Sequence, residues 1–548
     1  MVDVRAATVG RSTGRTDLIL SFTVPGLMLV APFVGAVRQV HHSILSADSV
    51  TAIAILLAIG AVAGVAIRHG GRVRVVTLAA FLTVALDLML KGTALSQSLP
   101  QRLFAIPLAP FFVATSFVIV LAVCHLLRAE LLRILASGFA VATVAALIGP
   151  VGGTPIGHTH TKAHVVSKPG RPLVLHLILD EHIGIDGIPT DLPGGRELRQ
   201  TLTAFYDEFG FRLYRRSFSP YVDTRDSLPN LFNFGRQGVA AAFLTEPEKL
   251  FEPPYVLSRN DYFERLKALG YRIRVYESTF LDVCRAQAAP IADCYIYPEW
   301  GFESARRNLS LTGRLRLLST AYLQDSLVYR TAKIDVLQRL HRRFPGTPVF
   351  TWERANSGPL TSLPTLQLLE KDLTTARPGE AYVAHLLMPH NPYVYEADCA
   401  VRDPADWRSI EDTGALLLTD LDRRDLYDGY FRQMSCLYKR LHEMFVRLRE
   451  SGRLNDAVVI VHGDHGSRIA APRRGRWRRQ DYVAMYSTIF AVKAPGVQPG
   501  HDDSFHSVHH LFARLWNEQS SDPPVIYVPE DADPAELEPQ PVSNLGWE

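Results

Sequence analysis

Apolar residues are concentrated in the first part of the chain. Five long apolar runs lie at roughly 18–37, 49–67, 74–90, 105–127 and 131–151. Each is close to the roughly 20 residues that an α-helix needs to cross a bilayer. Five such runs in succession are hard to house in a soluble core. The first run is not expected to be a cleavable signal peptide, because it is long and no small-residue cleavage site follows it. The pattern predicts a membrane domain over residues 1–154 with five transmembrane helices.

Lys and Arg in the loops between these runs indicate an orientation. Eight arginines lie on the side of the N-terminus, and three basic residues, Arg38, Lys91 and Arg102, lie on the opposite side. Because cytoplasmic loops carry the excess of positive charge, the N-terminus is expected in the cytoplasm. An odd number of spans then places everything after about residue 155 outside the cytoplasm.

The pattern changes after a Gly- and Thr-rich linker at 155–171. Candidate strands begin at residue 173 (LVLHLIL), 272 (RIRVYE), 347 (TPVFT), 381 (AYVAHLLM), 457 (AVVIV) and 488 (TIFAVK). Between the fourth and fifth of these runs, apolar residues recur at helical spacing: Leu437, Leu441, Met444, Phe445 and Leu448. The alternation predicts an α/β domain over residues 172–520, with a mainly parallel sheet between helices, and a C-terminal tail at 521–548.

Cysteine usage tests the predicted compartment. Of five cysteines, Cys124 lies in a predicted span and four lie in the outer domain. Disulfides persist outside the cytoplasm, so we expect Cys284 to pair with Cys294 and Cys399 with Cys436. Four free thiols are the alternative.

Two predicted strands end in residues that bind cations. The first ends in Asp180-Glu181, and the run from Val458 ends in Gly463-Asp464-His465-Gly466. Parallel strands would bring these carboxylates and the imidazole to one edge of the sheet, where ligands bind in open α/β folds. Carboxylate and imidazole groups suit a divalent cation such as zinc. A turn or helix cap is the alternative for a single Asp.

Two further segments carry candidate catalytic groups. In SFSPYVDTRDSLPNLF (217–232), Thr224 and Ser227 stand in a polar loop before Pro229 and an apolar pair that opens a helix. A hydroxyl at a helix N-terminus faces an anion favourably, and a metal can activate it. In MPHNPY, His390 is a candidate for metal or phosphate binding or for proton transfer, whereas His385, inside the apolar run, is expected in the core.

Taken together, VVIVHGDHGSR (458–468), LILDE (177–181), TRDSLP (224–229) and LLMPHNPY (386–393) resemble the alkaline phosphatase superfamily. The branch that they resemble most is membrane-bound and contains phosphoethanolamine transferases, lipoteichoic acid synthases and sulfatase-like proteins. That branch has five membrane helices before an extracytoplasmic catalytic domain. The resemblance covers nearly the whole chain.

The resemblance implies roles for individual residues. Glu181, Asp464 and His465 match metal ligands, Asp180 matches a neighbour or additional ligand, and Thr224 matches the nucleophile, which would also contact the metal. His390 matches the substrate-side histidine. The transferases usually carry a further His after the Asp-His-Gly motif, where this chain has Arg and Trp, so whether a second metal binds stays open. The roles of His501, His506 and His509 stay open.

The resemblance also implies a function. It predicts a metal-dependent transferase in a bacterial inner membrane that uses zinc, with manganese or magnesium as alternatives. The enzyme would move a phosphoethanolamine or phosphoglycerol group from a membrane phospholipid to an envelope glycan or lipid through a phospho-threonine. The absence of a C/S-x-P-x-R pattern near Thr224 disfavours a true sulfatase. A phosphate or sulfate ester hydrolase and a non-catalytic envelope protein are the alternatives.

One remaining feature is the interval RIAAPRRGRWRR (468–479), with six arginines directly after the metal motif. Guanidinium groups pair with phosphates, so the interval is a candidate substrate lip or lipid contact, and a solvated loop is the alternative. Nucleic acid is not expected, because the domain lies outside the cytoplasm and aromatic residues are scarce in the interval.

Overall fold

The computed structural model describes residues 5–39, 42–90, 102–103, 106–107, 109–127, 130–148, 157–160, 170–235, 255–284, 291–297, 308–323, 326–332, 358–407, 420–469, 479–520, 525–529 and 537–545. The chain divides into two compact units, one of residues 1–153 with 309–355 and one of residues 154–308 with 356–548. The predicted strand at 347 lies outside the described residues.

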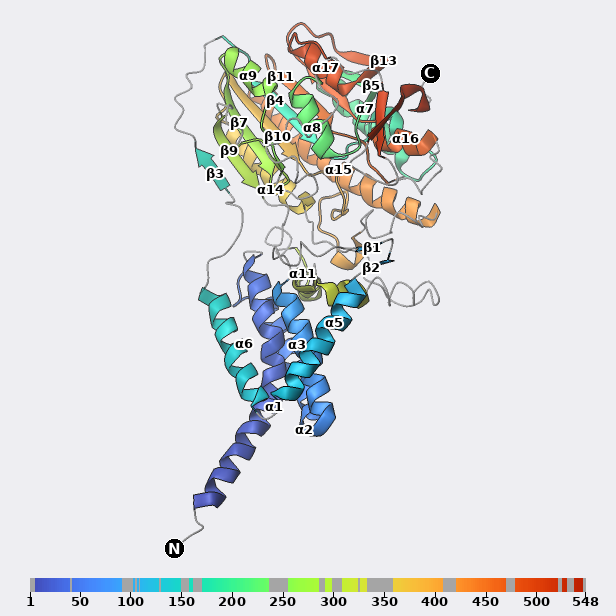
Figure 1. Ribbon diagram of the computed structural model, residues 1–548. Coiled ribbons are helices and arrows are strands. Elements are labelled where there is room, and N and C mark those ends of the chain that lie inside the picture. Colours follow the sequence, from blue (N-terminus) through green and yellow to red (C-terminus); the bar gives the residue numbers. More distant parts are fainter. Residues whose placement is uncertain are drawn as a thin grey trace. The chain divides into compact units, whose positions relative to one another are not determined.

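The first unit is a helical bundle (Figure 1). Four of its helices are long and apolar enough to cross a membrane: Thr16–Gln39, Ala47–Arg68, Gly71–Leu90 and Leu131–Ile148. The helix at Pro110–Leu126 is apolar but shorter, so a count of five spans stays a prediction. The elements of this unit are α1 (Arg5–Gln39), α2 (Ala47–Arg68), α3 (Gly71–Leu90), β1 (Arg102–Leu103), β2 (Ile106–Pro107), α5 (Ala109–Leu126), α6 (Leu131–Ile148), α11 (Leu311–Leu323) and α12 (Leu327–Arg330).

Close backbone contact joins α1 to α2. A Cβ built on Gly60 would lie 2.2 Å from the backbone nitrogen of Gly26, so only glycine fits there. Small residues that let two helices approach this closely are typical of packing within a membrane.

A segment from the middle of the sequence completes this bundle. Tyr322 on α11 donates to the carbonyl of Leu29 over 2.8 Å, and the Asp87 carboxylate accepts from Ser326 and from two backbone N–H groups of α12. The described part of residues 309–355, which the predicted 172–520 domain includes, groups with the N-terminal helices.

The second unit is an α/β fold built on a mainly parallel sheet (Figure 1). The nine strands that the described residues contribute run in the order β13-β5-β12-β11-β4-β10-β7-β9-β3. Their bounds are β3 (Gly157–His160), β4 (Val174–Leu179), β5 (Arg212–Phe218), β7 (Arg272–Ser278), β9 (Ile291–Tyr297), β10 (Glu380–Leu386), β11 (Val458–Gly463), β12 (Phe490–Lys493) and β13 (Gly500–Ser507). The central strand β4 is parallel to both neighbours, β10 and β11, whereas β12 and β3 are antiparallel to theirs.

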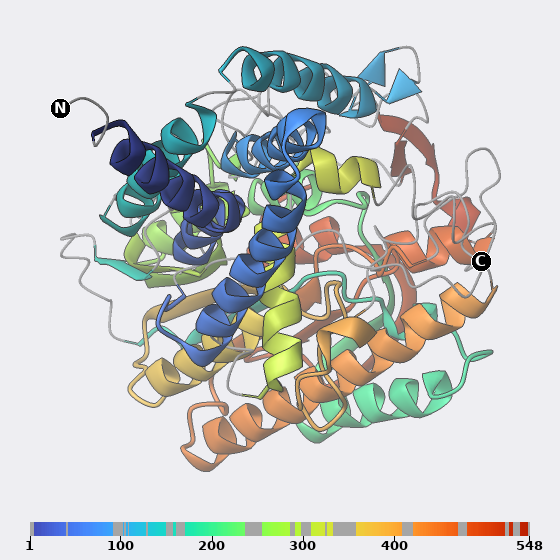
Figure 2. The ribbon, with the colours of Figure 1, turned by 90° about the horizontal axis from the view of Figure 1, so that it is seen from below.

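Buried apolar runs explain why these central strands form. Every residue of β4 and β10 is buried, as expected for strands of a parallel sheet with both faces covered. The predicted apolar face on the helix before β11 is confirmed: Leu437, Leu441, Met444, Phe445 and Leu448 are all buried on α15 (Asp420–Glu450). In Figure 2, α15 lies alongside α7 (Gly195–Glu208).

The remaining elements of this unit connect or flank the sheet. They are η1 (Ile185–Gly187), α8 (Thr224–Phe232), β6 (Tyr255–Val256), α9 (Asp261–Ala268), β8 (Leu281–Asp282), α14 (Gly358–Leu373), η5 (Pro404–Asp406), α16 (Arg479–Tyr486), α17 (Val508–Leu515), β14 (Val525–Pro529), β15 (Leu537–Pro541) and η7 (Val542–Leu545). The predicted linker contributes the edge strand β3, and the predicted tail contains the β14–β15 hairpin. Both predicted disulfides are present, Cys284–Cys294 and Cys399–Cys436.

Candidate metal centre

Strand register brings three groups to one edge of the sheet. Leu179, the last residue of β4, pairs with Gly463 on β11 and with Leu386 on β10. Asp180 and Asp464 therefore follow neighbouring strand ends, and His385 stands one residue before the end of β10. The register therefore brings the strand ends before Asp180 and Asp464 together, as predicted.

The side chains of these three residues form a compact, buried cluster. One ligand atom from each of Asp180, His385 and Asp464 lies within 4.8 Å of the others. Asp180 Oδ1 and His385 Nε2 are buried and have no hydrogen-bond partner among the described residues. Buried polar atoms are nearly always paired, so these two unpaired atoms, on side chains that approach to 3.8 Å, fit a site for a cation.

The pKa shifts of the two aspartates also fit a cation site. Burial, reinforced by the nearby charges of Asp464 and Glu181, raises the pKa of Asp180 well above its usual range. Burial also opposes ionisation of Asp464, but His465, His385 and the hydrogen bond from Thr224 outweigh it and lower its pKa. A divalent cation would relieve the repulsion between these carboxylates.

The carboxylate of Glu277 orients His385. Nδ1 of His385 lies 2.7 Å from Glu277 Oε1, and both side chains are buried. Burial raises the pKa of Glu277 despite its contact with His385. A carboxylate on one ring nitrogen leaves the other nitrogen free for a metal, which is the usual arrangement around metal-binding histidines.

Thr224 is the first residue of α8, and its hydroxyl faces the cluster. Its Oγ1 donates to Asp464 Oδ2 over 2.6 Å and lies 3.5 Å from His465 Nε2. Asp223 caps the helix by accepting from the backbone N–H of Arg225. The helix therefore begins at Thr224 and contains Ser227 and Pro229, whereas the sequence had suggested a loop that ends at Pro229.

His465 completes the group around Thr224. Its Nε2 lies 3.3 Å from Asp464 Oδ2 and 3.8 Å from Asp180 Oδ1. The glycines on either side of Asp464-His465 permit close packing: a Cβ on Gly466 would lie 2.1 Å from the carbonyl oxygen of Ala484. Asp180, Thr224, Asp464 and His465, all predicted, thus meet around one point with His385.

Glu181 is placed differently from the other predicted ligands. Its Oε1 accepts from Arg468 Nε over 2.6 Å, and its Oε2 accepts from the backbone N–H of Asn391 over 3.3 Å. The metal-type cluster found in the described residues does not include it. Burial opposes ionisation of Glu181, but Arg468, His390 and His465 together lower its pKa.

His390 lies beside this ion pair, 3.7 Å from Glu181 Oε1. Arg468 Nη2 lies 3.1 Å from His390 Nε2. Because a guanidinium only donates, Nε2 is the acceptor and the ring proton is on Nδ1, which contacts the carbonyl of Asn391.

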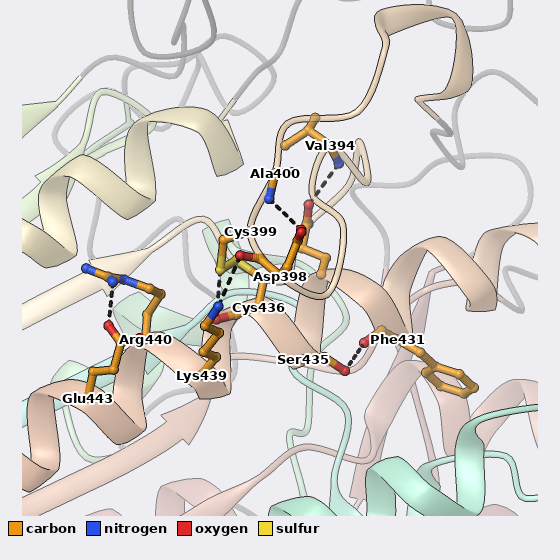
Figure 3. The surroundings of a disulfide bond; sticks show 11 residues. Val394, Asp398, Cys399, Ala400, Phe431, Ser435, Cys436, Lys439, Arg440 and Glu443 are labelled. Carbon is orange, nitrogen blue, oxygen red and sulfur yellow. Dashed lines mark hydrogen bonds and ion pairs between the residues drawn. A yellow bond between two sulfur atoms is a disulfide. The ribbon is translucent and has the colours of Figure 1, made fainter. Parts of the chain in front are cut away.

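The loop that carries His390 is fixed to α15 by a polar side chain and a disulfide. Buried Gln433 donates to the carbonyls of Pro389 and His390 and accepts from the N–H of Val394. Figure 3 shows the Cys399–Cys436 disulfide that joins the same loop to the same helix.

The loop that follows β4 also contacts α15. The hydroxyl of Tyr430 donates to the carbonyl of Glu181 and accepts from the N–H of Ile183. One helix therefore positions both Glu181 and His390.

No protein-family model matches the sequence, and no curated protein matches it. Solved structures do match. The periplasmic domain of EcEptC from Escherichia coli, in complex with Zn, aligns at 12% identity over 72% of this chain and 100% of that chain, with a TM-score of 0.37. A lipoteichoic acid synthase, LtaP from Listeria monocytogenes, aligns at 12% identity over 67% of this chain and 86% of that one, with a TM-score of 0.34.

A phosphonate monoester hydrolase of Agrobacterium radiobacter aligns at 12% identity over 65% of this chain and 80% of that chain, with a TM-score of 0.38. The matched proteins are alkaline phosphatase superfamily members. This is the family that the sequence resembles.

The C-terminal histidines lie elsewhere. His501 pairs with Asp207, and His506 lies 3.6 Å from Asp502. His509 is buried on α17, with its ring 5.7 Å from that of Tyr221. Of the Arg-rich interval, residues 470–478 lie outside the described part of the chain.

Three site residues were missed or misjudged from the sequence. His385 was expected in the core, and it is buried, but its free nitrogen faces the two aspartates. Its position one residue before the end of a predicted strand, in a sheet where two other strands end just before an Asp, was the available signal. Glu277 and Gln433 carried no sequence signal, because their roles depend on which strands and helices become neighbours.

Proposed function

We propose that this chain is a membrane-anchored transferase that moves a phosphoethanolamine or phosphoglycerol group from a phospholipid to an envelope glycan or lipid. One observation carries the proposal: the hydroxyl of Thr224, at a helix N-terminus, donates to Asp464 Oδ2 over 2.6 Å beside a buried donor set for a cation. That set, Asp180, His385 and Asp464, with His465 3.8 Å from Asp180, suits zinc, with manganese or magnesium as alternatives. The cation, when bound, would lower the pKa of the threonine hydroxyl and offset charge on the phosphorus oxygens.

Thr224 acts as the nucleophile in this proposal. The hydrogen bond to Asp464 fixes the direction of its O–H, so a lone pair of Oγ1 is free for attack. The Oγ1–P bond forms as the bond from phosphorus to the diacylglycerol oxygen breaks, and the Thr224 proton leaves along its hydrogen bond to Asp464. The departing oxygen takes a proton from solvent to give diacylglycerol, and phospho-threonine remains. The acceptor hydroxyl then attacks the same phosphorus and releases Thr224.

His390 suits the second half of this reaction. Its Nε2 is an acceptor in the structure, so it can take the proton of the entering hydroxyl once Arg468 turns toward the substrate. The short contact from Nδ1 to the backbone of Asn391 holds the tautomer that this role needs.

A lipid donor follows from the N-terminal unit. Four helices are long and apolar enough to cross a membrane, and the two disulfides suit an extracytoplasmic domain. We therefore place the protein in a bacterial inner membrane with its catalytic domain on the periplasmic or extracellular side. A lipid head group would then be available to the catalytic domain as the donor.

Two other functions use the same scaffold. A phosphate or sulfate ester hydrolase would pass the group to water, and a non-catalytic envelope protein would bind without turnover. The test is product analysis: zinc-loaded protein in detergent micelles receives head-group-labelled phosphatidylethanolamine or phosphatidylglycerol, with and without envelope glycolipids. Label on the acceptor supports the transferase, free labelled head group alone supports the hydrolase, and no diacylglycerol release in any arm contradicts both.

A further inference from the structure

Arg468 follows the Asp464-His465-Gly466 loop and turns back toward the site. Its backbone is left-handed, with φ of 52°, and its side chain is 28% exposed, whereas the Glu181 side chain that it contacts is fully buried. Nε and Nη2 both contact Glu181 Oε1. One edge of the guanidinium is thus held by a buried carboxylate while the group still reaches solvent.

Glu181 is already occupied by protein groups. Arg468 engages Oε1, and the N–H of Asn391 donates to Oε2. The backbone of Glu181 is left-handed too, with φ of 61°, and its N–H donates to Asp464 Oδ1. This backbone turns the side chain of Glu181 toward Arg468 and leaves Asp180 to face the cluster.

We propose that Arg468 is the anion-binding residue of this site, and that Glu181 is its positioning residue rather than a ligand of the cation. Arg468 would hold a non-bridging oxygen of the phosphoryl group next to Thr224. A guanidinium presents its donors in a fixed plane, which matches phosphate oxygens in a way that a lone ammonium does not.

The carboxylates near the site would repel an anion unless a cationic side chain offsets them. Asp180, Glu181 and Asp223 all act electrostatically on Arg468, and Asp464 acts on Asp180. Arg225 pairs with Asp226 at 3.0 Å and is turned to that partner. Among the described residues, Arg468 is the arginine that contacts both Glu181 and His390.

The assignment rests on the proposed function for the identity of the anion, and its test does not require turnover. The full chain in detergent micelles is dialysed against zinc, and its zinc content is measured by mass spectrometry. Binding of inorganic phosphate to the zinc-loaded protein is then measured by calorimetry. The variants are Glu181→Gln, Arg468→Gln, Arg468→Lys and Asp464→Asn, with Arg432→Gln, a surface arginine paired with Glu396, as the matched control.

We expect Glu181→Gln to keep its zinc, whereas Asp464→Asn loses it. Arg468→Gln should keep zinc and bind phosphate at least about 10-fold more weakly, Arg468→Lys should recover part of that loss, and Arg432→Gln should match wild type. Zinc loss in Glu181→Gln, unchanged phosphate affinity in Arg468→Gln, or no phosphate binding by wild type would each overturn the assignment. If phospholipid never labels Thr224 while Arg468→Gln still loses phosphate selectively, the proposed function fails and the assignment of Arg468 stands.

Discussion

Glu181 and Arg468, 287 positions apart in the sequence, meet in an ion pair with 2.6 Å between Oε1 and Nε. Both residues have a left-handed backbone, a conformation that non-glycine residues rarely adopt. Such conformations cost on the order of 1–3 kcal/mol each and persist where the surroundings impose them, typically at functional sites. Glu181 follows Asp180 in the sequence, so this strained pair lies next to the candidate metal cluster.

Removing the hydroxyl of Thr224 should abolish turnover without disturbing the fold. We expect Thr224→Ala to lower kcat by at least about 10³-fold, because removal of a nucleophile from a catalytic group costs this much or more. Thr224→Ser keeps the hydroxyl and should retain measurable activity. Release of diacylglycerol is the measurement, and equal activity of Thr224→Ala and wild type would contradict the account.

His385 should be needed for metal binding. His385→Ala removes a donor, and Glu277→Gln removes the carboxylate that orients it over 2.7 Å. We expect Glu277→Gln to weaken zinc binding about 10–100-fold, as is usual for such supporting carboxylates, and His385→Ala to weaken it more. Zinc titration with a competing chelator measures both, with His442→Ala, an exposed histidine paired with Glu208, as control. Zinc affinities equal to wild type would place the cation elsewhere.

The two disulfides should differ in their effect on activity. Cys399–Cys436 closes a loop of 37 residues and Cys284–Cys294 one of 10. Loop-closure entropy predicts losses of about 4 and about 3 kcal/mol in the free energy of unfolding when each pair is replaced by serine. Because only the first bridge holds the His390 loop, only its loss should also lower kcat. Thermal unfolding and turnover of the two double variants test this order, and a larger loss of activity on removing Cys284–Cys294 would refute it.

Gln433 should support His390 through the backbone. Gln433→Leu leaves the carbonyls of Pro389 and His390 and the N–H of Val394 without this buried partner. Each unsatisfied group costs about 1–3 kcal/mol. We expect a lower unfolding temperature and a lower kcat with zinc content unchanged, and Ser435→Ala on the same helix, which loses one bond to Phe431, should behave like wild type. Unchanged kcat in Gln433→Leu would remove this helix from the account of the site.

Asp502 gives a pH-dependent contribution to stability at the edge of the sheet. Burial opposes its ionisation, but hydrogen bonds from Arg212 and Ser504 outweigh this and lower its pKa to about 2. Since the pKa is lower in the folded state, the stabilisation is present above the ordinary value of about 3.9 and is lost as the pH falls through 2. Asp502→Asn should therefore destabilise by less than about 1 kcal/mol at pH 7 and not at pH 2. Thermal unfolding at both pH values tests this, with the exposed Asp503→Asn as control, and an equal effect at both would contradict it.

Much of the sheet could be predicted from the sequence because its central strands are buried on both faces. Continuous apolar runs predicted β4, β10 and β11, and parallel pairing then placed Asp180 and Asp464 at one edge. The same property hid His385: when both faces of a strand are buried, alternation does not show which side a residue faces.

Other features depended on contacts that no local pattern encodes. Asp180 and Glu181 are adjacent carboxylates at a strand end, and only the left-handed backbone of Glu181 decides which of them faces the cluster. Likewise, the packing of α11 with the N-terminal helices depends on tertiary contacts such as the one from Tyr322 to Leu29.

The most direct test is to trap the covalent intermediate. Zinc-loaded protein is mixed with phospholipid labelled in the head-group phosphate, quenched in acid, digested and analysed by mass spectrometry. The account predicts a labelled adduct on the peptide that contains Thr224, present in wild type and absent in Thr224→Ala. A label on another residue, or turnover of the lipid with no adduct at any quench time, would contradict it.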